Sequence, residues 1–190
     1  MMELRVENLC KSYHGRPVLQ NVSLTAGDGV TCVMAPSGAG KTTLLRILLG
    51  LERADGGAVL GAEGCRWAAV FQEDRLLEHL DALGNLRFVL GGDLDAARAC
   101  ALLEELGLGD VGTKAVRDYS GGMKRRLALA RALLASSDAL ALDEPFTGLD
   151  GDNRGRAMAC VRRAGLEKPV LLVTHDEGDV SGLGAKIFRL

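Results

Sequence analysis

Apolar residues follow different spacings along this 190-residue chain, and the spacings predict its elements. Alternating apolar positions within residues 4–9 and 18–24 predict short strands around a turn at 14–17. The β-branched run at 30–35 predicts a buried strand, and residues 41–49 carry apolar positions at helical spacing. The N-terminal part should therefore hold two short strands, then a buried strand that runs into a helix.

Leucines dominate the middle of the chain and recur there at helical intervals. The three stretches with this spacing are 76–90, 94–106 and 123–134. They interrupt the strand patterns on either side. We therefore expect an inserted helical subdomain at about 75–135.

Shorter apolar runs flank this helical segment. Residues 56–64 are Gly-rich and predict a hairpin or loop, whereas 68–71 predict a short strand. Strand patterns return at 139–142 and 170–173, separated by a helical stretch near 154–164. Strands that alternate with helices at this spacing predict an α/β fold with a parallel sheet and right-handed crossovers.

The composition is that of an ordinary globular protein, with 47% hydrophobic and 25% charged residues, and it fits one domain over 1–190. A net charge of −2 argues against nucleic acid as a partner, because proteins that neutralise phosphates are usually basic. No apolar run approaches the roughly 20 residues of a membrane-spanning helix. Any role at a membrane is expected to depend on a partner.

A run of small residues between the buried strand and the following helix carries the strongest chemical signal. Residues 35–42 read Ala-Pro-Ser-Gly-Ala-Gly-Lys-Thr. Such a loop lets backbone N–H groups surround phosphates at a helix N-terminus, while Lys41 reaches the β- and γ-phosphates and Thr42 ligates Mg²⁺. A simple Gly-rich turn is the less favoured interpretation, because it does not explain the strand–loop–helix context. The predicted nucleotide contacts here are Pro36, Ser37, Gly38, Ala39, Gly40, Lys41, Thr42 and Thr43.

Two carboxylates follow the strand pattern at 139–142. Asp143 and Glu144 should stand at the carboxyl edge of the parallel sheet, where ligands bind in such folds. Asp143 suits a contact to Mg²⁺, and Glu144 suits a base that polarises the attacking water. The pair gains its meaning from the phosphate loop upstream, since strands that end in Asp-Glu are common.

A third motif identifies a family. Ser120-Gly121-Gly122-Met123, followed by Ala-Arg-Ala-Leu at 130–133, is similar to the signature of ABC transporter ATP-binding subunits. With the phosphate loop and the Asp-Glu pair, the chain resembles this family nearly end to end. The resemblance implies a P-loop NTPase core with a parallel sheet, an N-terminal antiparallel β subdomain and the inserted helices. It also implies ATP and Mg²⁺ as cofactors.

Further positions match the family pattern and take their roles from the resemblance. Tyr13 resembles the aromatic residue that stacks on adenine, and Gln72 the glutamine that senses Mg²⁺ or water and hinges the helical subdomain. His175, within Val-Thr-His-Asp, matches the histidine that contacts the γ-phosphate. In the family, Ser120, Gly121 and Gly122 meet the ATP held by a second subunit, and an aspartate matching Asp150 communicates across that dimer. The catalytic set is then Lys41, Gln72, Glu144 and His175, with Thr42, Gln72 and Asp143 at the metal.

Within the family, the segments 72–77 and 120–123 most resemble the nitrate, sulfonate and taurine importer branch. The expected function is ATP hydrolysis that drives import through separate transmembrane permease subunits, by a cytoplasmic protein on the inner face of the membrane. The alternatives are a soluble ABC ATPase not linked to transport and a module that dimerises around ATP without turnover. Three departures stand out: Ala35 replaces the leading glycine, Tyr119 and Met123 replace the usual Leu and Gln, and the chain stops at Leu190.

Overall fold

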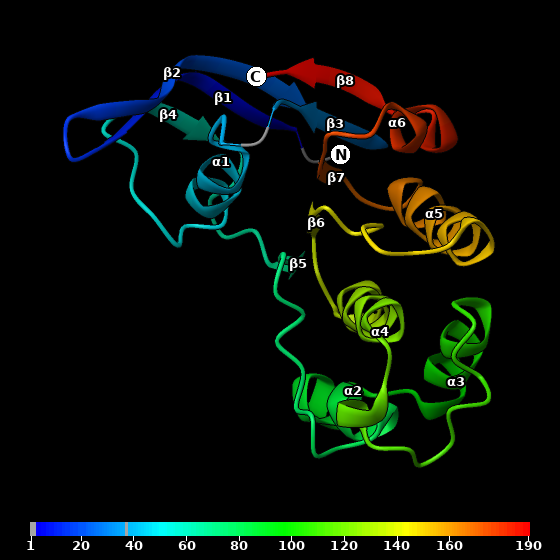
Figure 1. Ribbon diagram of the computed structural model, residues 1–190. Coiled ribbons are helices and arrows are strands. Elements are labelled where there is room, and N and C mark those ends of the chain that lie inside the picture. Colours follow the sequence, from blue (N-terminus) through cyan, green and yellow to red (C-terminus); the bar gives the residue numbers. More distant parts are fainter. Residues whose placement is uncertain (1–2, 37) are drawn as a thin grey trace.

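The fold is given by a computed structural model that describes residues 3–36 and 38–190 (Figure 1). The predicted contact Ser37 lies outside the described residues. The strands are β1 (Leu4–Tyr13), β2 (Arg16–Ala26), β3 (Val30–Met34), β4 (Gly56–Leu60), β5 (Trp67–Val70), β6 (Ala139–Asp143), β7 (Val170–Thr174) and β8 (Lys186–Arg189). The α-helices are α1 (Lys41–Leu48), α2 (Ala82–Leu90), α3 (Ala96–Glu105), α4 (Gly121–Leu134), α5 (Gly151–Gly165) and α6 (Glu177–Leu183).

A parallel sheet of five strands, in the order β5-β6-β7-β3-β8, forms the centre of the molecule. Every residue of β3, β6 and β7 is buried, which explains why these strands are continuous apolar runs rather than alternating ones. The ends of β3, β6 and β7 lie at one edge of the sheet, because Met34 pairs with Thr174 and Asp143 with Val173. Residues that follow these strands are thereby brought close together.

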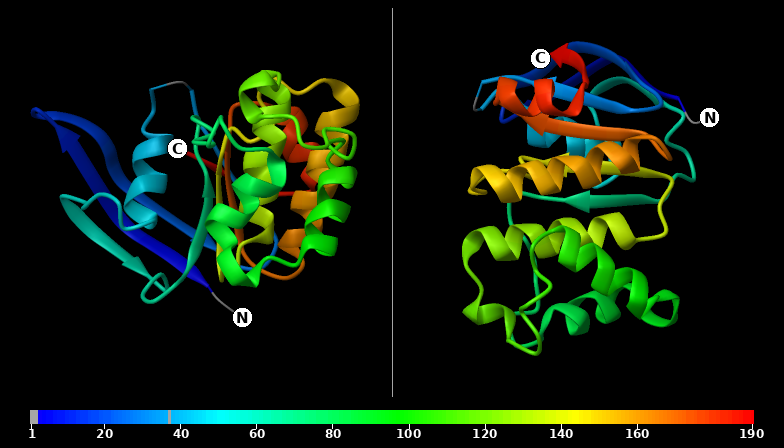
Figure 2. Two further views of the ribbon diagram at one scale, coloured as in Figure 1. Left: turned by 90° about the horizontal axis from the view of Figure 1, so that it is seen from below. Right: turned by 90° about the vertical axis from the view of Figure 1, so that its right-hand side faces the viewer.

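A smaller antiparallel sheet, in the order β2-β1-β4, covers one side of the central sheet (Figure 2). The prediction of a loop or hairpin at 56–64 is wrong for its first half, because β4 pairs with β1 there. Gly57 has φ +86°, and a Cβ added to it would lie 2.5 Å from the carbonyl oxygen of Glu7. The glycine thus serves a close strand approach that composition alone reads as a turn.

The helices α2, α3 and α4 lie on the opposite side of the central sheet, within the predicted segment 75–135 (Figures 1 and 2). The predicted helix at 76–90 starts later, at Ala82, because the Asp81 side chain accepts a hydrogen bond from Gly84 N at 2.7 Å and caps it there. Helix α6 and strand β8 follow the last predicted strand and were not predicted from the sequence pattern.

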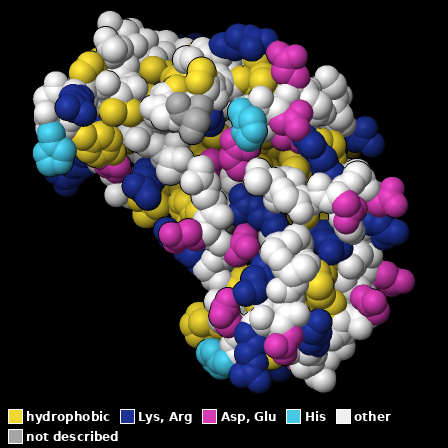
Figure 3. All heavy atoms as spheres, in the orientation of Figure 1, with side chains coloured by type: hydrophobic (Ala, Val, Ile, Leu, Met, Phe, Trp, Pro, Cys, Tyr) yellow, Lys and Arg dark blue, Asp and Glu magenta, His cyan; other side chains and the backbone are white. Residues whose placement is uncertain are grey.

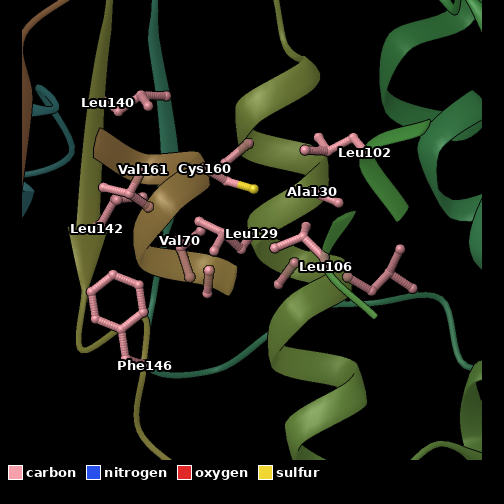
Figure 4. Packing of buried hydrophobic residues seen from close by; sticks show 14 of the residues in the cluster. Val70, Leu102, Leu106, Leu129, Ala130, Leu140, Leu142, Phe146, Cys160 and Val161 are labelled. Atoms are coloured by element: carbon pink, nitrogen blue, oxygen red, sulfur yellow. The ribbon is translucent and has the colours of Figure 1, made fainter. Parts of the chain in front are cut away.

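Two apolar clusters flank the central sheet, and neighbouring residues of one strand enter different clusters. Cys32 packs with α4 and α5, whereas Val33 packs with α1 and the antiparallel sheet. Figure 4 shows the first cluster, where Leu142 of β6 lies near Val161 of α5 and Leu129 of α4. The α/β class, the antiparallel N-terminal sheet and the inserted helices are as predicted.

In the part of the chain that the structure describes, none of the helices combines the length and the apolar character needed to cross a membrane.

Candidate functional site

The loop between β3 and α1 is shaped by glycines with left-handed backbone. Gly38 has φ +82° and Gly40 has φ +91°, conformations that side-chain-bearing residues rarely adopt. A Cβ at Gly40 would also lie 2.8 Å from Leu19 Cδ2 and 3.0 Å from the carbonyl oxygen of Val18. The loop therefore folds back against β2 and delivers the chain directly into α1.

Lys41, the first residue of α1, turns its ammonium group into this loop. Its Nζ donates hydrogen bonds to the carbonyl oxygens of Ala35 at 2.7 Å and Pro36 at 3.0 Å, and the residue is only 9% exposed. Two carbonyl oxygens compensate the charge only in part, since neither carries a full negative charge. A phosphate at the N-terminus of α1 would supply the missing counter-charge.

Thr42 and Asp143 meet although they are 101 residues apart in the sequence. The Thr42 hydroxyl donates to Asp143 Oδ2 at 2.9 Å. Asp143 is 1% exposed, and burial raises the pKa of its carboxyl above the ordinary value. Its other oxygen, Oδ1, is buried and has no hydrogen-bond partner in the described part of the chain. A buried carboxylate oxygen with unused capacity beside a threonine hydroxyl fits a hard divalent cation such as Mg²⁺.

Glu144 and His175 form the next pair along the same sheet edge. The imidazole Nδ1 of His175 lies 2.8 Å from Glu144 Oε1, and this hydrogen bond raises the pKa of His175. Glu144 has φ +51°, and its N–H donates to the carbonyl oxygen of Val173 at 2.9 Å. A left-handed glutamate after a buried strand is a strained arrangement, which the surrounding structure must hold in place.

Tyr13 ends β1 and reaches the site from the antiparallel sheet. Its hydroxyl donates to Glu52 Oε1, and the Lys11 ammonium lies 5.4 Å from its ring centroid. The hydrogen bond from Tyr13 lowers the pKa of Glu52. The ring is 37% exposed and has its polar tip fixed, so it presents an apolar surface on which a planar group could stack.

Most of these side chains line one cleft of about 1020 Å³, which opens on a face that is hollowed between the sheets and the helical insertion (Figure 3). The volume suits a nucleotide-sized ligand. Both residues that the sequence predicted for the site and residues that it did not predict line the cleft. The lining residues are Tyr13, Val18, Pro36, Gly38, Gly40, Lys41, Thr42, Thr43, Gln72, Asp74, Gly121, Gly122, Arg125, Glu144, Thr147, Gly148 and His175.

Four described residues of the predicted set do not line this cleft: Ala39, Ser120, Asp143 and Asp150. Asp143 lies behind Thr42, as its hydrogen bond requires. Ser120 caps α4 by accepting from Met123 N at 3.2 Å, and Asp150 caps α5 by accepting from Asn153 N at 3.0 Å. Both caps are exposed, and neither takes part in the cleft that this chain forms by itself.

Sequence reasoning missed Val18, Asp74 and Arg125 as cleft residues. Arg125 is only 5% exposed. The available signal was a charged residue within the apolar spacing of 123–134. Thr147 and Gly148 belong to the loop before Asp150, whose sequence was noted only for its aspartate.

A family model described as ABC transporter matches residues 19–147, which span the phosphate loop, Gln72, the signature and Glu144. The chain belongs to the ABC transporter family. Within that family it is an ATP-binding subunit with ATPase activity, as the resemblance implied.

Curated relatives cover almost the whole chain. The aliphatic sulfonates import ATP-binding protein SsuB of Delftia acidovorans is 41% identical over 195 residues, which is 98% of this chain and 79% of the relative. SsuB 1 of Rhodococcus jostii (strain RHA1) is 39% identical over 94% of this chain and 75% of the relative. The predicted likeness to the nitrate, sulfonate and taurine importer branch is confirmed.

Among solved structures, the dimeric structure of MJ0796, a bacterial ABC transporter cassette, superposes with a TM-score of 0.85. The two sequences are 27% identical, and the match covers 98% of this chain and 94% of the other. The P-loop NTPase fold is thereby established for this chain.

Proposed function

We propose that this chain is the ATPase subunit of an importer for organic sulfonates or similar anions, and that it hydrolyses Mg²⁺-ATP in the cleft between α1 and α4. The observation that carries the proposal is the Thr42–Asp143 contact, where a buried Asp143 oxygen has no hydrogen-bond partner among the described residues. The buried Lys41 ammonium follows in the adjoining loop. Such a pair of groups fits the metal and the terminal phosphates of a nucleoside triphosphate. The sulfonate class follows from the names of the relatives.

Binding uses both sheets. The amides of Gly38 and Gly40 and the N-terminus of α1 surround the phosphates, and Lys41 exchanges its carbonyl partners for phosphate oxygens. Tyr13 stacks on the adenine at the far end of the cleft. Thr42, Asp143 and Gln72 would hold Mg²⁺, which would neutralise charge that develops on the phosphates during transfer.

Hydrolysis uses the pair at the sheet edge. Glu144 accepts a proton from the attacking water, while His175 holds Glu144 through Nδ1 and leaves its other ring nitrogen for the γ-phosphate. The raised pKa of His175 favours the imidazolium, which suits contact with an anion. The carboxylate thus acts on water while the His175 imidazole stands beside the departing phosphate.

A second cassette completes the assembly. Ser120 and Asp150 are exposed caps outside the cleft of their own chain, so we assign them, with Gly121 and Gly122, to the ATP of a paired cassette. This arrangement is supported by the likeness to a cassette solved as a dimer. The pair would drive transmembrane permease subunits from the cytoplasmic face of the membrane.

The test is Glu144→Gln. It removes the base but keeps the shape, so hydrolysis should fall by roughly 10²- to 10⁴-fold while Mg²⁺-ATP still binds. Binding without turnover should also trap a dimer that elutes earlier on size exclusion with ATP than without. The matched control is Glu63→Gln at an exposed site outside the cleft, which should behave as wild type. Normal turnover of Glu144→Gln would refute the assignment, and an ATP-bound monomer would refute the pairing.

The import assignment needs the membrane partner. Vesicles that carry the permease, with this chain and ATP enclosed inside, should take up an alkanesulfonate from outside. Glu144→Gln should abolish that uptake. If the vesicles hydrolyse ATP but take up no sulfonate, the import of sulfonates is refuted, and only the ATPase activity remains.

A further inference from the structure

Helix α4 carries a buried arginine pair immediately after the signature, and the two side chains serve different neighbours. Arg125 is 5% exposed and Arg126 is 7% exposed. Arg126 donates from Nη1 to the carbonyl oxygens of Leu106 at 2.7 Å and Gly107 at 2.9 Å, on the side of α3. Arg125 instead enters the cleft, where the nucleotide is proposed to bind.

One half of the Arg125 guanidinium holds the segment 71–74, which contains Gln72. Nη1 donates to the carbonyl oxygen of Phe71 and to Asp74 Oδ1 at 3.0 Å, with a longer contact of 3.4 Å to the carbonyl oxygen of Gln72. This segment connects β5 to the inserted helices. Its backbone at Phe71 and Gln72 is therefore fixed to α4 by the Arg125 side chain.

The other half holds the end of β6. Nη2 donates to the carbonyl oxygen of Asp143 and to that of Glu144 at 2.7 Å. Glu144 has the left-handed backbone described above, with φ +51°. A charge-assisted hydrogen bond to its carbonyl oxygen opposes relaxation of this strained residue.

The guanidinium is occupied by these contacts. Four acceptors match its four terminal N–H groups, so these four N–H groups are not available for a phosphate. The residue must then act through the groups it holds rather than on the reacting atoms. Holding the segment 71–74 and the end of β6 together requires the planar guanidinium, whose two terminal nitrogens point to different segments. A lysine ammonium is a single point charge and cannot bond both segments in this way.

We propose that Arg125 is a positioning residue for hydrolysis: it fixes Gln72 and Glu144 relative to the helix whose N-terminus carries Ser120, Gly121 and Gly122. A shift of α4 that accompanies engagement of the signature would move the backbone of both residues through one side chain. The inference rests on the proposed function, since it takes Glu144 as the base and Gln72 as a metal contact.

Arg131 on the same helix provides the matched comparison. Its Nη1 donates to the carbonyl oxygen of Arg75 at 2.7 Å and its Nη2 to that of Asp74 at 2.8 Å. It therefore holds the end of the same connection between β5 and the inserted helices, at residues 74 and 75. None of its hydrogen bonds among the described residues reaches Asp143 or Glu144.

The experiment compares Arg125→Gln, Arg125→Lys and Arg131→Gln in the full chain, with Kd for Mg²⁺-ATP, kcat, KM and melting temperature measured for each. A misplaced catalytic group costs up to about 100-fold in rate. We expect Arg125→Gln to lose roughly 10- to 100-fold in kcat with Kd within about threefold of wild type. Compared with Arg125→Gln, Arg125→Lys should restore the melting temperature of the wild type but only part of its kcat. Arg131→Gln should lose melting temperature and keep kcat within about threefold.

Three results would overturn the proposal. One is an unchanged kcat in a folded Arg125→Gln protein or, if that variant does not fold, in Arg125→Lys. Another is an equal loss of kcat in Arg131→Gln, which would mean that loosening segment 71–74 is sufficient. The third is a rise in Kd by as large a factor as the fall in kcat, which would make Arg125 a binding residue.

Failure of the proposed function would look different. Glu144→Gln serves as the reference in the same assays. If it keeps normal turnover, the assignment of the base fails, and the role of Arg125 fails with it. If Glu144→Gln is arrested while both Arg125 variants turn over normally, only the role of Arg125 is refuted.

Discussion

The two walls of the cleft are built by different means. The wall at α1 comes from one short stretch of sequence, whose glycine backbone and helix N-terminus create the shape. The wall at α4 combines residues near 72, 122, 144 and 148, and the buried Arg125 side chain joins the pieces near 72 and 144. Local sequence can encode a binding surface by itself, whereas a surface assembled from distant segments needs long-range hydrogen bonds to hold it.

The first wall should be the more sensitive in binding. Lys41→Ala removes the cation that is held between the loop carbonyls and, in the proposed complex, meets the phosphates. Each charge-assisted hydrogen bond that is lost should weaken Mg²⁺-ATP roughly 10- to 150-fold, as measured by titration with a fluorescent nucleotide. Lys186→Ala, at an exposed site on β8, is the control. An unchanged Kd would show that this wall does not bind the phosphates.

The glycine backbone of that wall can be tested by a matched pair. At Gly38 an added Cβ meets no atom of the described residues within 4 Å, so Gly38→Ala should cost only the left-handed strain of about 1–2 kcal/mol. At Gly40 the Cβ also meets Leu19 and Val18, and Gly40→Ala should cost a further 1–3 kcal/mol or so. Urea unfolding without nucleotide measures both. Equal losses would mean that the loop does not pack against β2 as closely as described.

Arg154 of α5 holds the segment that follows His175, a residue that lines the cleft. It donates to Asp176 and, from Nη2, to Asp179 Oδ1 at 2.5 Å. The hydrogen bond from Arg154 lowers the pKa of Asp176, so its stabilisation is present above the ordinary value of 3.8 and is lost as pH falls through the lower folded value. Arg154→Met should therefore lower the melting temperature at pH 7.

The difference from wild type should narrow as the pH is taken below about 3.8. Thermal unfolding followed by circular dichroism from pH 7 to pH 3 gives the profile. Arg162→Met, exposed on the same helix, controls for the loss of a cation. A difference that widens toward low pH would contradict the ion pair.

The smallest effect is expected at the adenine end. Glu52→Gln weakens the hydrogen bond that fixes the Tyr13 hydroxyl but leaves the ring in place. A base–aromatic stack is worth about 1–3 kcal/mol, and loosening one partner should cost only a fraction of it. KM for ATP should rise about two- to fivefold with kcat unchanged. A fall in kcat at constant KM would indicate that Tyr13 does not act by stacking on the adenine.

The sequence predicted the first wall almost completely, because a phosphate loop is a local pattern in which glycines, lysine and threonine occupy fixed positions. It also predicted the parallel sheet, whose buried strands are continuous apolar runs. The roles of the site residues remain predictions.

Other features depended on tertiary contacts that a pattern does not contain. Strand β4 was missed because pairing with β1 outweighs the low strand propensity of its glycines. Arg125 and Glu52 were missed because each acts through a partner far away in sequence, and a single charged residue carries no periodic signal. The unpartnered Oδ1 of Asp143 likewise exists only once β6 lies beside α1.

The distance in sequence between Thr42 and Asp143 has a consequence for how the protein is made. The two residues are 101 positions apart, and β3 pairs with β7, where Val30 lies opposite Val170. During synthesis, the phosphate loop emerges long before Asp143, its proposed neighbour at Mg²⁺, and long before β7. Contacts of such long range form late in folding, because the intervening chain must first be closed. The capacity to hold Mg²⁺-ATP should therefore appear only when the sheet is complete, so nucleotide binding would mark a finished subunit and not a growing one.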